Sequence, residues 1–285
     1  MVKCRFCKSE NVLKYGFRTC RKKGKTQKYI CRNCGSQFTP NEGFLHTANT
    51  KDIITIALDL YFKGLSLRKI KDHLIQFYNT KVSHTTIYYW IKNYSLLINN
   101  YTESLKIDSE VWNADETGLY FKRHLHWLWN IIDKDTKFLI SVRLTKFKYV
   151  DYNRNIFTDT KKLKIEPAAI ITDGFIGYRG LIKQNYPFSE HIIGNGIANR
   201  GIINTIERLN GSIKERYKIM RGFHSFNSAK IILNGWKCYY NFIRPHMSLN
   251  GKTPAEVSGI NLNLKNNKWL NLIQKSAENG KISFR

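Results

Sequence analysis

The stretch "PAAIITDGFIGY", residues 167–178, decides the fold. Its centre, residues 169–171, is a short apolar run without alternating polar residues, which is typical of a strand covered on both faces. Asp173 ends the strand, directly before Gly174. A carboxylate at the tip of a buried strand is unfavourable unless a cation or hydrogen bonds offset the burial of its charge. The stretch therefore predicts a central strand with a functional aspartate at its end.

The flanking sequence extends this strand into an α/β domain. Residues 110–121, "EVWNADETGLYF", form a β-run, and residues 124–144 predict two strands joined by a turn. A helical stretch follows at 150–163, then the buried strand, a helix, a strand at 191–194, and a helix within 204–218. Three meandering strands followed by alternating helices and strands predict an α/β domain with layered helices and sheet.

A second aspartate, Asp115, lies in the middle of the first predicted strand. If the first and the buried strands are neighbours, Asp115 and Asp173 come side by side, and their repulsion requires Mg²⁺ or Mn²⁺. Glu116 follows directly, but successive side chains of a strand point to opposite faces. We therefore expect only one of Asp115 and Glu116 to join a given site.

Three motifs in this order, "NADET", "ITDGFIGY" and "NTIERLNGSIKERYKIMRGF", resemble those of DDE transposases with a ribonuclease H-like core. The insertion sequence six family and its archaeal relatives are the most similar, and "YYNFIRPHMSLNGKTPAE" is similar to endings found in this group. The resemblance covers roughly residues 110–256. It implies that Asp115, Asp173 and Glu207 are the catalytic triad and bind two Mg²⁺ or Mn²⁺ ions.

The resemblance also implies an activity. The protein is expected to be an insertion-sequence transposase that binds double-stranded DNA at element ends, hydrolyses a phosphodiester to free a 3′-OH, and joins that 3′-OH to target DNA. Hard divalent ions prefer carboxylate oxygens, and a pair of them can stabilise both the attacking and the leaving oxygen. A homodimer or higher oligomer is implied. The alternative is a non-catalytic DNA-binding regulator derived from a transposase.

Five of the six cysteines lie within the first 34 residues. Four of them form two Cys-x-x-Cys pairs: Cys4, Cys7, Cys31 and Cys34. Two such pairs suit a tetrahedral structural Zn²⁺ site, and a segment this small needs such a staple. A redox pair and disulfides are the competing interpretations. We expect Cys20 to be a spare thiol and Cys238 to be a core residue.

Residues 50–64, 65–78 and 82–94 show helical periodicity. The second helix places Leu67, Ile70, Leu74 and Phe77 on one apolar face. Three short helices with tight turns predict a helix-turn-helix, with three-helix packing without DNA as the alternative. The candidate DNA-binding residues, here and elsewhere in the chain, are Arg21, Lys22, Lys23, Lys25, His84, Thr86, Tyr89, Lys92, Arg208, Lys214, Lys218 and Arg244.

The net charge of +26 indicates a polyanionic partner. Residues 1–50 carry +9, residues 51–110 carry +2, and the remainder carries +15, so several parts of the protein are expected to touch DNA. No long apolar run predicts a membrane span, and the N-terminus lacks the apolar core of a signal peptide. We expect a cytoplasmic, nucleoid-associated prokaryotic protein.

The chain is expected to divide into four parts, with the α/β, ribonuclease H-like catalytic core preceded by two DNA-binding domains. These are a zinc ribbon (1–45), a helix-turn-helix domain (46–105), the catalytic core (106–256) and a C-terminal tail (257–285). The tail has one apolar cluster at residues 269–273, which can dock on a partner subunit or fold back on its own core.

Overall fold

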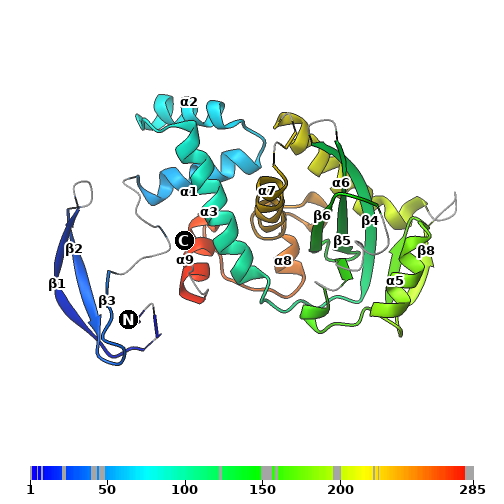
Figure 1. Cartoon of the computed structure of the whole chain (residues 1–285), viewed down its shortest axis with the longest axis horizontal. Coiled ribbons are helices and arrows are strands. Elements are labelled where there is room, and N and C mark those ends of the chain that lie inside the picture. Colours follow the sequence, from blue (N-terminus) through cyan, green and yellow to red (C-terminus); the bar gives the residue numbers. More distant parts are fainter. Residues whose placement is uncertain are drawn as a thin grey trace.

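The computed structural model of the chain shows a small N-terminal sheet, a group of helices, and a larger sheet with helices packed against it (Figure 1). It describes residues 2–279 except 5, 8, 21–23, 40–43, 45–48, 122–123, 149–155, 158–159, 195–199, 221 and 224, and it does not describe the side chains of 20, 24, 162 and 200–203.

The N-terminal sheet is antiparallel and has the order β1-β2-β3. Its strands are β1 (Val12–Cys20), β2 (Gly24–Cys31) and β3 (Gln37–Phe38). The pairing of β1 with β2 shifts between Lys14 and Phe17, where Gly16 adopts a φ of 64°, a backbone conformation that glycine tolerates best. The fully buried hydrophobic residues under this sheet are Cys4, Cys31 and Phe38, so its apolar core is small.

The three predicted helices are present, and each starts at a hydroxyl N-cap. They are α1 (Lys51–Phe62), α2 (Leu67–Tyr78) and α3 (His84–Thr102). The side chains of Thr50, Ser66 and Ser83 accept hydrogen bonds from backbone N–H groups of the first helical turn, which stabilises each start. α3 runs eight residues beyond the periodic stretch that predicted it, because its second half is buried against other helices.

One expectation for α2 was wrong. Ile70 and Leu74 are fully buried, but Phe77, expected on the same apolar face, is 64% exposed. It lies in the last turn of α2, where its ring packs against the ring of His73 at 4.7 Å rather than against the core. Periodicity identified the face of the helix but not where along the helix the packing ends.

The C-terminal tail folds back onto the helices. It carries α9 (Lys268–Asn279), which packs against α1 and α3. Trp269 stacks on Phe62 and Tyr239, and its indole N–H donates to Asp59 Oδ1 at 3.3 Å. Of the two alternatives left by the sequence, folding back on the chain's own core is the one observed.

The larger sheet is mixed and has the order β6-β5-β4-β7-β8. Its strands are β4 (Val111–Phe121), β5 (His124–Asp133), β6 (Leu139–Thr145), β7 (Ala169–Thr172) and β8 (Glu190–Ile193). β4, β5 and β6 form an antiparallel meander, and β7 and β8 run parallel to β4. All four residues of β7 are buried, as the opening stretch predicted. The expected mixed α/β class is confirmed.

The remaining elements surround this sheet. They are η1 (Lys161–Leu163), α5 (Gly177–Asn185), α6 (Arg200–Ile219), α7 (Phe226–Cys238), the π-helical turn η3 (Tyr239–Ile243), η4 (Met247–Leu249) and α8 (Pro254–Val257). α7 packs on both α3 and β6. A Cβ at Gly235 of α7 would meet Ser95 Oγ at 2.1 Å, so α3 and α7 approach closely only because this residue is glycine. Most of the helix predicted at 150–163 falls outside the described residues.

Candidate active site

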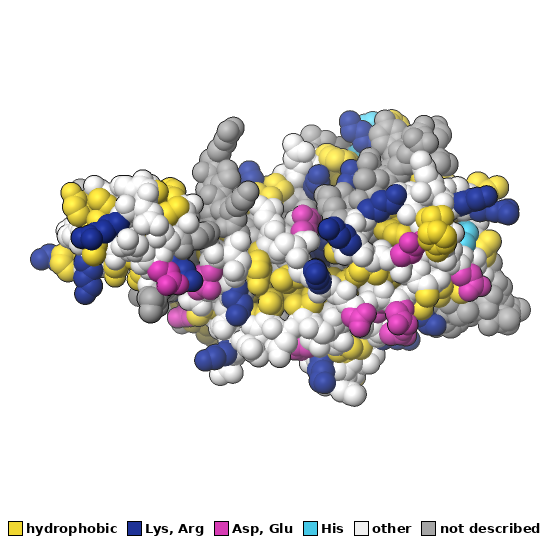
Figure 2. All heavy atoms as spheres, turned by 90° about the horizontal axis from the view of Figure 1, so that it is seen from below, with side chains coloured by type: hydrophobic (Ala, Val, Ile, Leu, Met, Phe, Trp, Pro, Cys, Tyr) yellow, Lys and Arg dark blue, Asp and Glu magenta, His cyan; other side chains and the backbone are white. Residues whose placement is uncertain are grey.

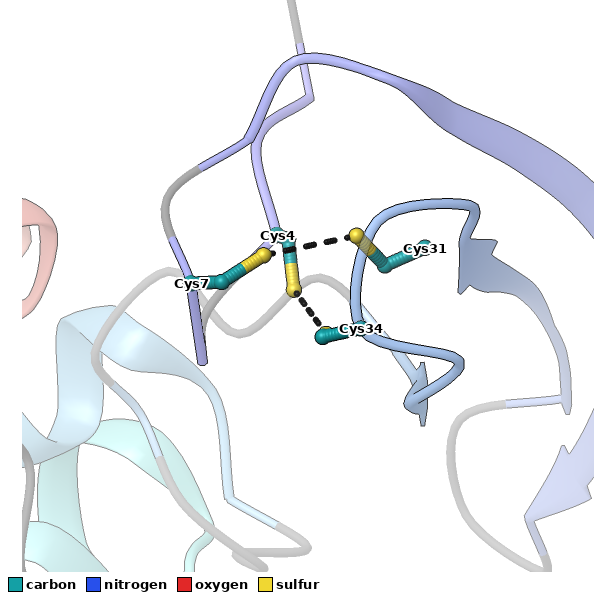
Figure 3. A group of neighbouring side chains, drawn as sticks. All are labelled: Cys4, Cys7, Cys31 and Cys34. Carbon is teal, nitrogen blue, oxygen red and sulfur yellow. Dashed lines mark hydrogen bonds between the residues drawn. The ribbon is translucent and has the colours of Figure 1, made fainter.

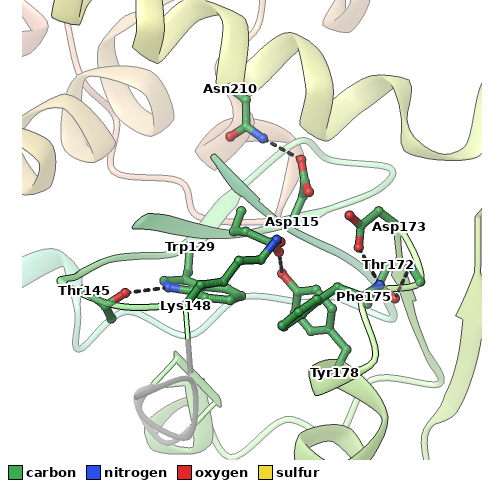
Figure 4. Close-up of polar contacts among 11 residues, drawn as sticks. Asp115, Trp129, Thr145, Lys148, Thr172, Asp173, Phe175, Tyr178 and Asn210 are labelled. Carbon is green, nitrogen blue, oxygen red and sulfur yellow. Dashed lines mark hydrogen bonds and ion pairs between the residues drawn. The ribbon is translucent and has the colours of Figure 1, made fainter. Parts of the chain in front are cut away.

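The register of the larger sheet brings Asp115 and Asp173 together. The parallel pairing of β4 with β7 aligns Val111 with Ala169 and Asn113 with Ile171. Continuing this register by two residues places Asp115 beside Asp173, just past the end of β7. The predicted neighbourhood of the two strands is therefore confirmed, and both carboxylates lie at the point where β7 leaves the sheet (Figure 4).

Asp173 is held by the turn that it begins. The backbone N–H of Phe175 donates to Asp173 Oδ1 at 3.0 Å, and the hydroxyl of Thr172 lies 3.4 Å from the backbone nitrogen of Gly174. Gly174 has a φ of 89°, which lets the chain turn sharply between β7 and α5. One oxygen of Asp173 is thus fixed by the backbone while the side chain stays partly exposed.

Glu116 joins the two aspartates, contrary to expectation. Asp115, Glu116 and Asp173 each offer a carboxylate oxygen within 4.8 Å of the other two, and these three residues are called the acidic cluster below. Strand alternation does send Asp115 and Glu116 to different helices, since Asp115 bonds to α6 and Glu116 to α5. The inference that this separation excludes Glu116 from the site was wrong, because neighbouring side chains on a strand can still bring oxygens close together.

Glu116 already has two partners of its own. Its side chain is 2% exposed; it accepts a hydrogen bond from the Tyr178 hydroxyl at 2.7 Å and forms an ion pair with Lys148. The Lys148 ammonium also lies 4.5 Å from the ring centre of Trp127 and 4.4 Å from that of Phe175. Figure 4 shows Lys148 extending over this part of the site. The negative charge of Glu116 is therefore offset by the protein itself.

Asn210 of α6 contacts Asp115 directly. Its Nδ2 donates to Asp115 Oδ2 at 2.6 Å, and its Oδ1 accepts from Asn130 Nδ2 at 2.6 Å. Asn130 is the residue of β5 that pairs with Asp115 in the sheet. Neither asparagine was identified from the sequence, because a single asparagine in a strand or helix has no distinguishing pattern. The one available signal was that Asn210 follows Glu207 by one helical turn.

Burial and crowding raise the pKa of Asp115 to about 7. Desolvation is the largest cause, followed by the charges of Glu116 and Asp173, with a smaller contribution from Glu207. A carboxyl group with this pKa holds a proton about half of the time at neutral pH. An ion that neutralises the neighbouring charges would lower this pKa, so the donor set suits a hard divalent cation.

Glu207 is placed near this cluster but not within it. It lies on α6 one turn before Asn210, its side chain is exposed, and its charge contributes to the raised pKa of Asp115. The three carboxylates whose oxygens lie within 4.8 Å of one another do not include Glu207. The structure thus brings together two residues of the expected triad and puts the third on the facing helix.

The four predicted cysteines also come together. Figure 3 shows Cys4 and Cys7 facing Cys31 and Cys34; the sulfurs of Cys4 and Cys34 are 3.6 Å apart, and those of Cys7 and Cys31 are 3.5 Å apart. All four are free thiols that can converge on one ion, and they are called the cysteine cluster below. Hydrogen bonds from the side chain and backbone of Ser36 lower the pKa of Cys34 to about 6. The donor set fits Zn²⁺, which prefers thiolates.

Two sets of relatives identify the chain. The family described as "DDE domain" matches residues 109–246. The transposase for insertion sequence element IS257 in transposon Tn4003 of Staphylococcus aureus is 25% identical over 202 residues, which cover 69% of this chain and 87% of the relative. The segment 109–246, just under half of the chain, is therefore similar to DDE domains. The transposase for insertion sequence-like element IS431mec of S. aureus strain Mu50 is similar to the same extent. The resemblance drawn from the motifs is confirmed.

Solved structures with a partial likeness to this chain come from retroviral integrases. The HTLV-2 integrase catalytic core domain in complex with magnesium is 17% identical with a TM-score of 0.41, covering 53% of this chain and 97% of that chain. A chain of the simian T-cell lymphotropic virus intasome is 14% identical with a TM-score of 0.43, covering 71% and 73%.

The residues predicted to touch DNA lie in several places. Lys25, His84, Tyr89, Arg208, Lys214 and Lys218 are exposed, whereas Thr86, Lys92 and Arg244 are partly buried; Arg21, Lys22 and Lys23 lie outside the described residues. Figure 2 shows Lys and Arg side chains scattered over one face of the protein. Within the described part of the chain, no helix combines the length and apolar character needed to span a membrane.

Proposed function

We propose that this protein is the transposase of an insertion sequence, which binds the ends of the element, cleaves one phosphodiester to free a 3′-OH, and joins that 3′-OH to target DNA. The single observation that supports this proposal most strongly is the placement of Asp115 and Asp173 side by side at the end of β7, with Glu207 on the facing helix. The transposase relatives support the same activity.

Asp115, Asp173 and Glu207 would hold two Mg²⁺ or Mn²⁺ ions. The donor set fits these ions, because the oxygens are hard ligands, and burial together with the neighbouring negative charges raises the pKa of Asp115. When bound, such ions stabilise the attacking and the leaving oxygen of a phosphoryl transfer. Glu116 is left out of this set, because Lys148 and Tyr178 already offset its charge.

The protein's own residues position the reacting groups. Asp115 and Asp173 are held on adjacent strands of a buried sheet, so their spacing is fixed before DNA arrives. Lys214 and Lys218 follow Glu207 by two and three turns on α6 and are exposed, which suits contact with the DNA backbone beside the site. Water attack on phosphorus breaks the bond to the 3′ oxygen, and that oxygen leaves as the 3′-OH.

The N-terminal parts are proposed to recognise DNA. The cysteine cluster would hold one structural Zn²⁺ beneath the hairpin of β1 and β2, with exposed Lys25 near its tip. Exposed His84 and Tyr89 at the start of α3 would contact the element end. Since the ends of an element must be brought together before they are joined, we propose that the active form is a homodimer or a higher oligomer.

A strand-transfer assay tests this function. Labelled duplexes that carry the DNA flanking the gene are incubated with plasmid and Mg²⁺ or Mn²⁺, using the wild type and Asp173→Asn. We expect joined product from the wild type alone. Binding of the duplexes without cleavage or joining by either protein would instead indicate a non-catalytic DNA-binding regulator.

A further inference from the structure

We propose that Asn210 is a positioning residue for the metal site: it orients Asp115 and fixes the distance between α6, which carries Glu207, and the sheet that carries the two aspartates. This inference rests on the proposed function and goes beyond it: Asn210 lies in the third motif, three residues after Glu207, but the motif assigns no role to it. It acts through Asp115 and Glu207 rather than on the substrate.

The contacts form a continuous chain from β5 to Asp115. Asn130 is fully buried and donates from Nδ2 to Asn210 Oδ1, and Asn210, only 6% exposed, donates from Nδ2 to Asp115 Oδ2; both distances are 2.6 Å. Asn130 and Asp115 face each other as a cross-strand pair of β5 and β4. A single side chain of α6 is therefore tied to two adjacent strands at the site.

The direction of these hydrogen bonds is fixed by chemistry. In its ionised form, the form that binds a cation, the Asp115 carboxylate only accepts hydrogen bonds, so Asn210 presents its NH₂ group to it. Its carbonyl then faces Asn130, which must donate in turn. The Oδ1 atom of Asn130 is buried without a hydrogen-bond partner among the described residues. Asn130 therefore donates to Asn210 although this orientation leaves one of its own acceptors unsatisfied. The hydrogen bond from Asn210 is made to Asp115 Oδ2 and does not involve Asp115 Oδ1.

The same contact sets the position of Glu207. Residues three apart on a helix lie on the same face, so the side chain that precedes Asn210 by one turn is directed towards the same part of the sheet. In the part of the chain that the structure describes, Glu207 makes no hydrogen bond to the acidic cluster, and the Asn210–Asp115 hydrogen bond links this turn of the helix to β4. A displacement of about 1 Å at a catalytic group can reduce a rate about a hundredfold.

Asn241 supplies a matched control for a purely structural role. It is also a fully buried asparagine, and its side chain makes two hydrogen bonds, accepting from the Leu139 backbone N–H at 2.8 Å and donating to the Leu139 carbonyl at 2.9 Å. Both bonds tie η3 to β6 and involve no member of the acidic cluster. Loss of Asn241 should therefore lower stability without changing the metal site.

The test compares Asn210→Ala, Asn130→Ala and Asn241→Ala with the wild type. Mn²⁺ binding to the full-length protein is measured by calorimetry without DNA, and the Mn²⁺ midpoint for DNA cleavage is measured separately. Outer-shell partners of metal ligands typically contribute about 10–100-fold to metal affinity or activity. We expect a loss of this size for Asn210→Ala, a smaller loss for Asn130→Ala, and unchanged Mn²⁺ affinity for Asn241→Ala, whatever its melting temperature.

The outcomes separate this inference from the proposed function. If the wild type binds Mn²⁺ and cleaves DNA while Asn210→Ala keeps both the wild-type affinity and the wild-type midpoint, Asn210 has no positioning role. If the wild type neither binds Mn²⁺ nor cleaves DNA, the proposed function itself fails. If Asn210→Ala does not fold, Asn210→Ser replaces it, because serine keeps a shorter hydroxyl donor. Wild-type Mn²⁺ affinity in both Asn210→Ser and Asn130→Ala would then overturn the inference.

Discussion

The cysteine cluster and the acidic cluster are both candidate metal sites, but their relation to the surrounding fold differs. The four thiols lie under a sheet whose buried apolar core consists of two of those same cysteines and Phe38. The carboxylates lie on strands of a large sheet within a core that extends through the helices and the C-terminal α9. In the first case a bound metal would supply much of the folding free energy; in the second we expect the fold to form without a metal.

The difference shows what each site demands of the sequence. At the cysteine cluster, the spacing of the cysteines along the chain is almost sufficient to predict the site, because two tight turns provide all four thiols. The proposed ligands of the divalent ions, Asp115, Asp173 and Glu207, come from β4, from the turn after β7 and from α6, so only the tertiary fold brings them together. A metal that completes a fold should be needed for structure, whereas a metal held by a finished fold should be needed for chemistry alone.

The largest expected effect concerns chemistry. Glu207→Gln removes one proposed metal ligand without changing the shape of α6, and we expect the rate of DNA cleavage to fall by about a thousandfold or more, as for the loss of a major transition-state stabiliser. DNA affinity should be retained, because the basic residues are unchanged. The matched control is Glu215→Gln, an exposed carboxylate on the same helix, which should cleave normally. Equal losses in both variants would refute the role of Glu207.

The second effect concerns structure. Cys31→Ser removes a buried thiol of the cysteine cluster, and we expect the protein to lose its Zn²⁺ and the protection of β1 and β2 from hydrogen exchange. The larger sheet should keep its exchange protection, because its core is separate from that of the N-terminal sheet. Cys20→Ser is the control and should retain one Zn²⁺ per chain. Loss of zinc from Cys20→Ser would show that the assignment of Cys20 as a spare thiol is wrong.

The third effect is a pH dependence of metal binding at the acidic cluster. Because the pKa of Asp115 is about 7, Mn²⁺ must displace a proton at lower pH. We expect the affinity for Mn²⁺ to fall about tenfold per pH unit below pH 7 and to level off above it. Calorimetry between pH 5.5 and pH 8.5 measures this dependence. In Glu116→Gln, which removes the nearest contributing charge, the break should move to lower pH; an affinity independent of pH would contradict the raised pKa.

The smallest effect is on the stability of the metal-free protein. The pKa of Asp115 is raised above its unfolded value of about 4, so the group destabilises the folded state above pH 7, and this cost declines as the pH falls from 7 towards 4. Asp115→Asn keeps an acceptor for Asn210 and removes the charge. We expect a melting temperature about 4 °C higher than that of the wild type at pH 8 in the presence of a chelator.

At pH 5 this gain should be much smaller. A lower melting temperature for Asp115→Asn at both pH values would mean that the carboxylate is stabilising. Cys31→Ser provides the contrast, because removing a ligand from the cysteine cluster should not raise the melting temperature at any pH.

Much of the fold could be predicted from local patterns. The apolar run of β7, the helical periodicity of α1 to α3 and the paired cysteines are properties of a few neighbouring residues, and all are observed. The partnership of Asp115 with Asp173 was also predictable, because it depends only on two strands being neighbours.

What the sequence could not provide depends on contacts between distant segments. Glu116 was excluded by strand alternation, which describes side-chain direction but not the reach of a carboxylate. Phe77 was placed on the apolar face of α2, although it is 64% exposed in the last turn of that helix. Asn130 and Asn210 are 80 residues apart in the chain. Their role becomes visible only when α6 packs on β4 and β5.

The central claim is that Asp115, Asp173 and Glu207 hold the divalent ions, and that Glu116 does not. The most direct test is a crystal structure with bound Mn²⁺, in which anomalous scattering locates the ions. We predict Mn²⁺ bound by oxygens of Asp115, Asp173 and Glu207, with Glu116 still paired to Lys148. Mn²⁺ bound by Glu116 in place of Glu207, or no Mn²⁺ at this end of β7, would contradict the account.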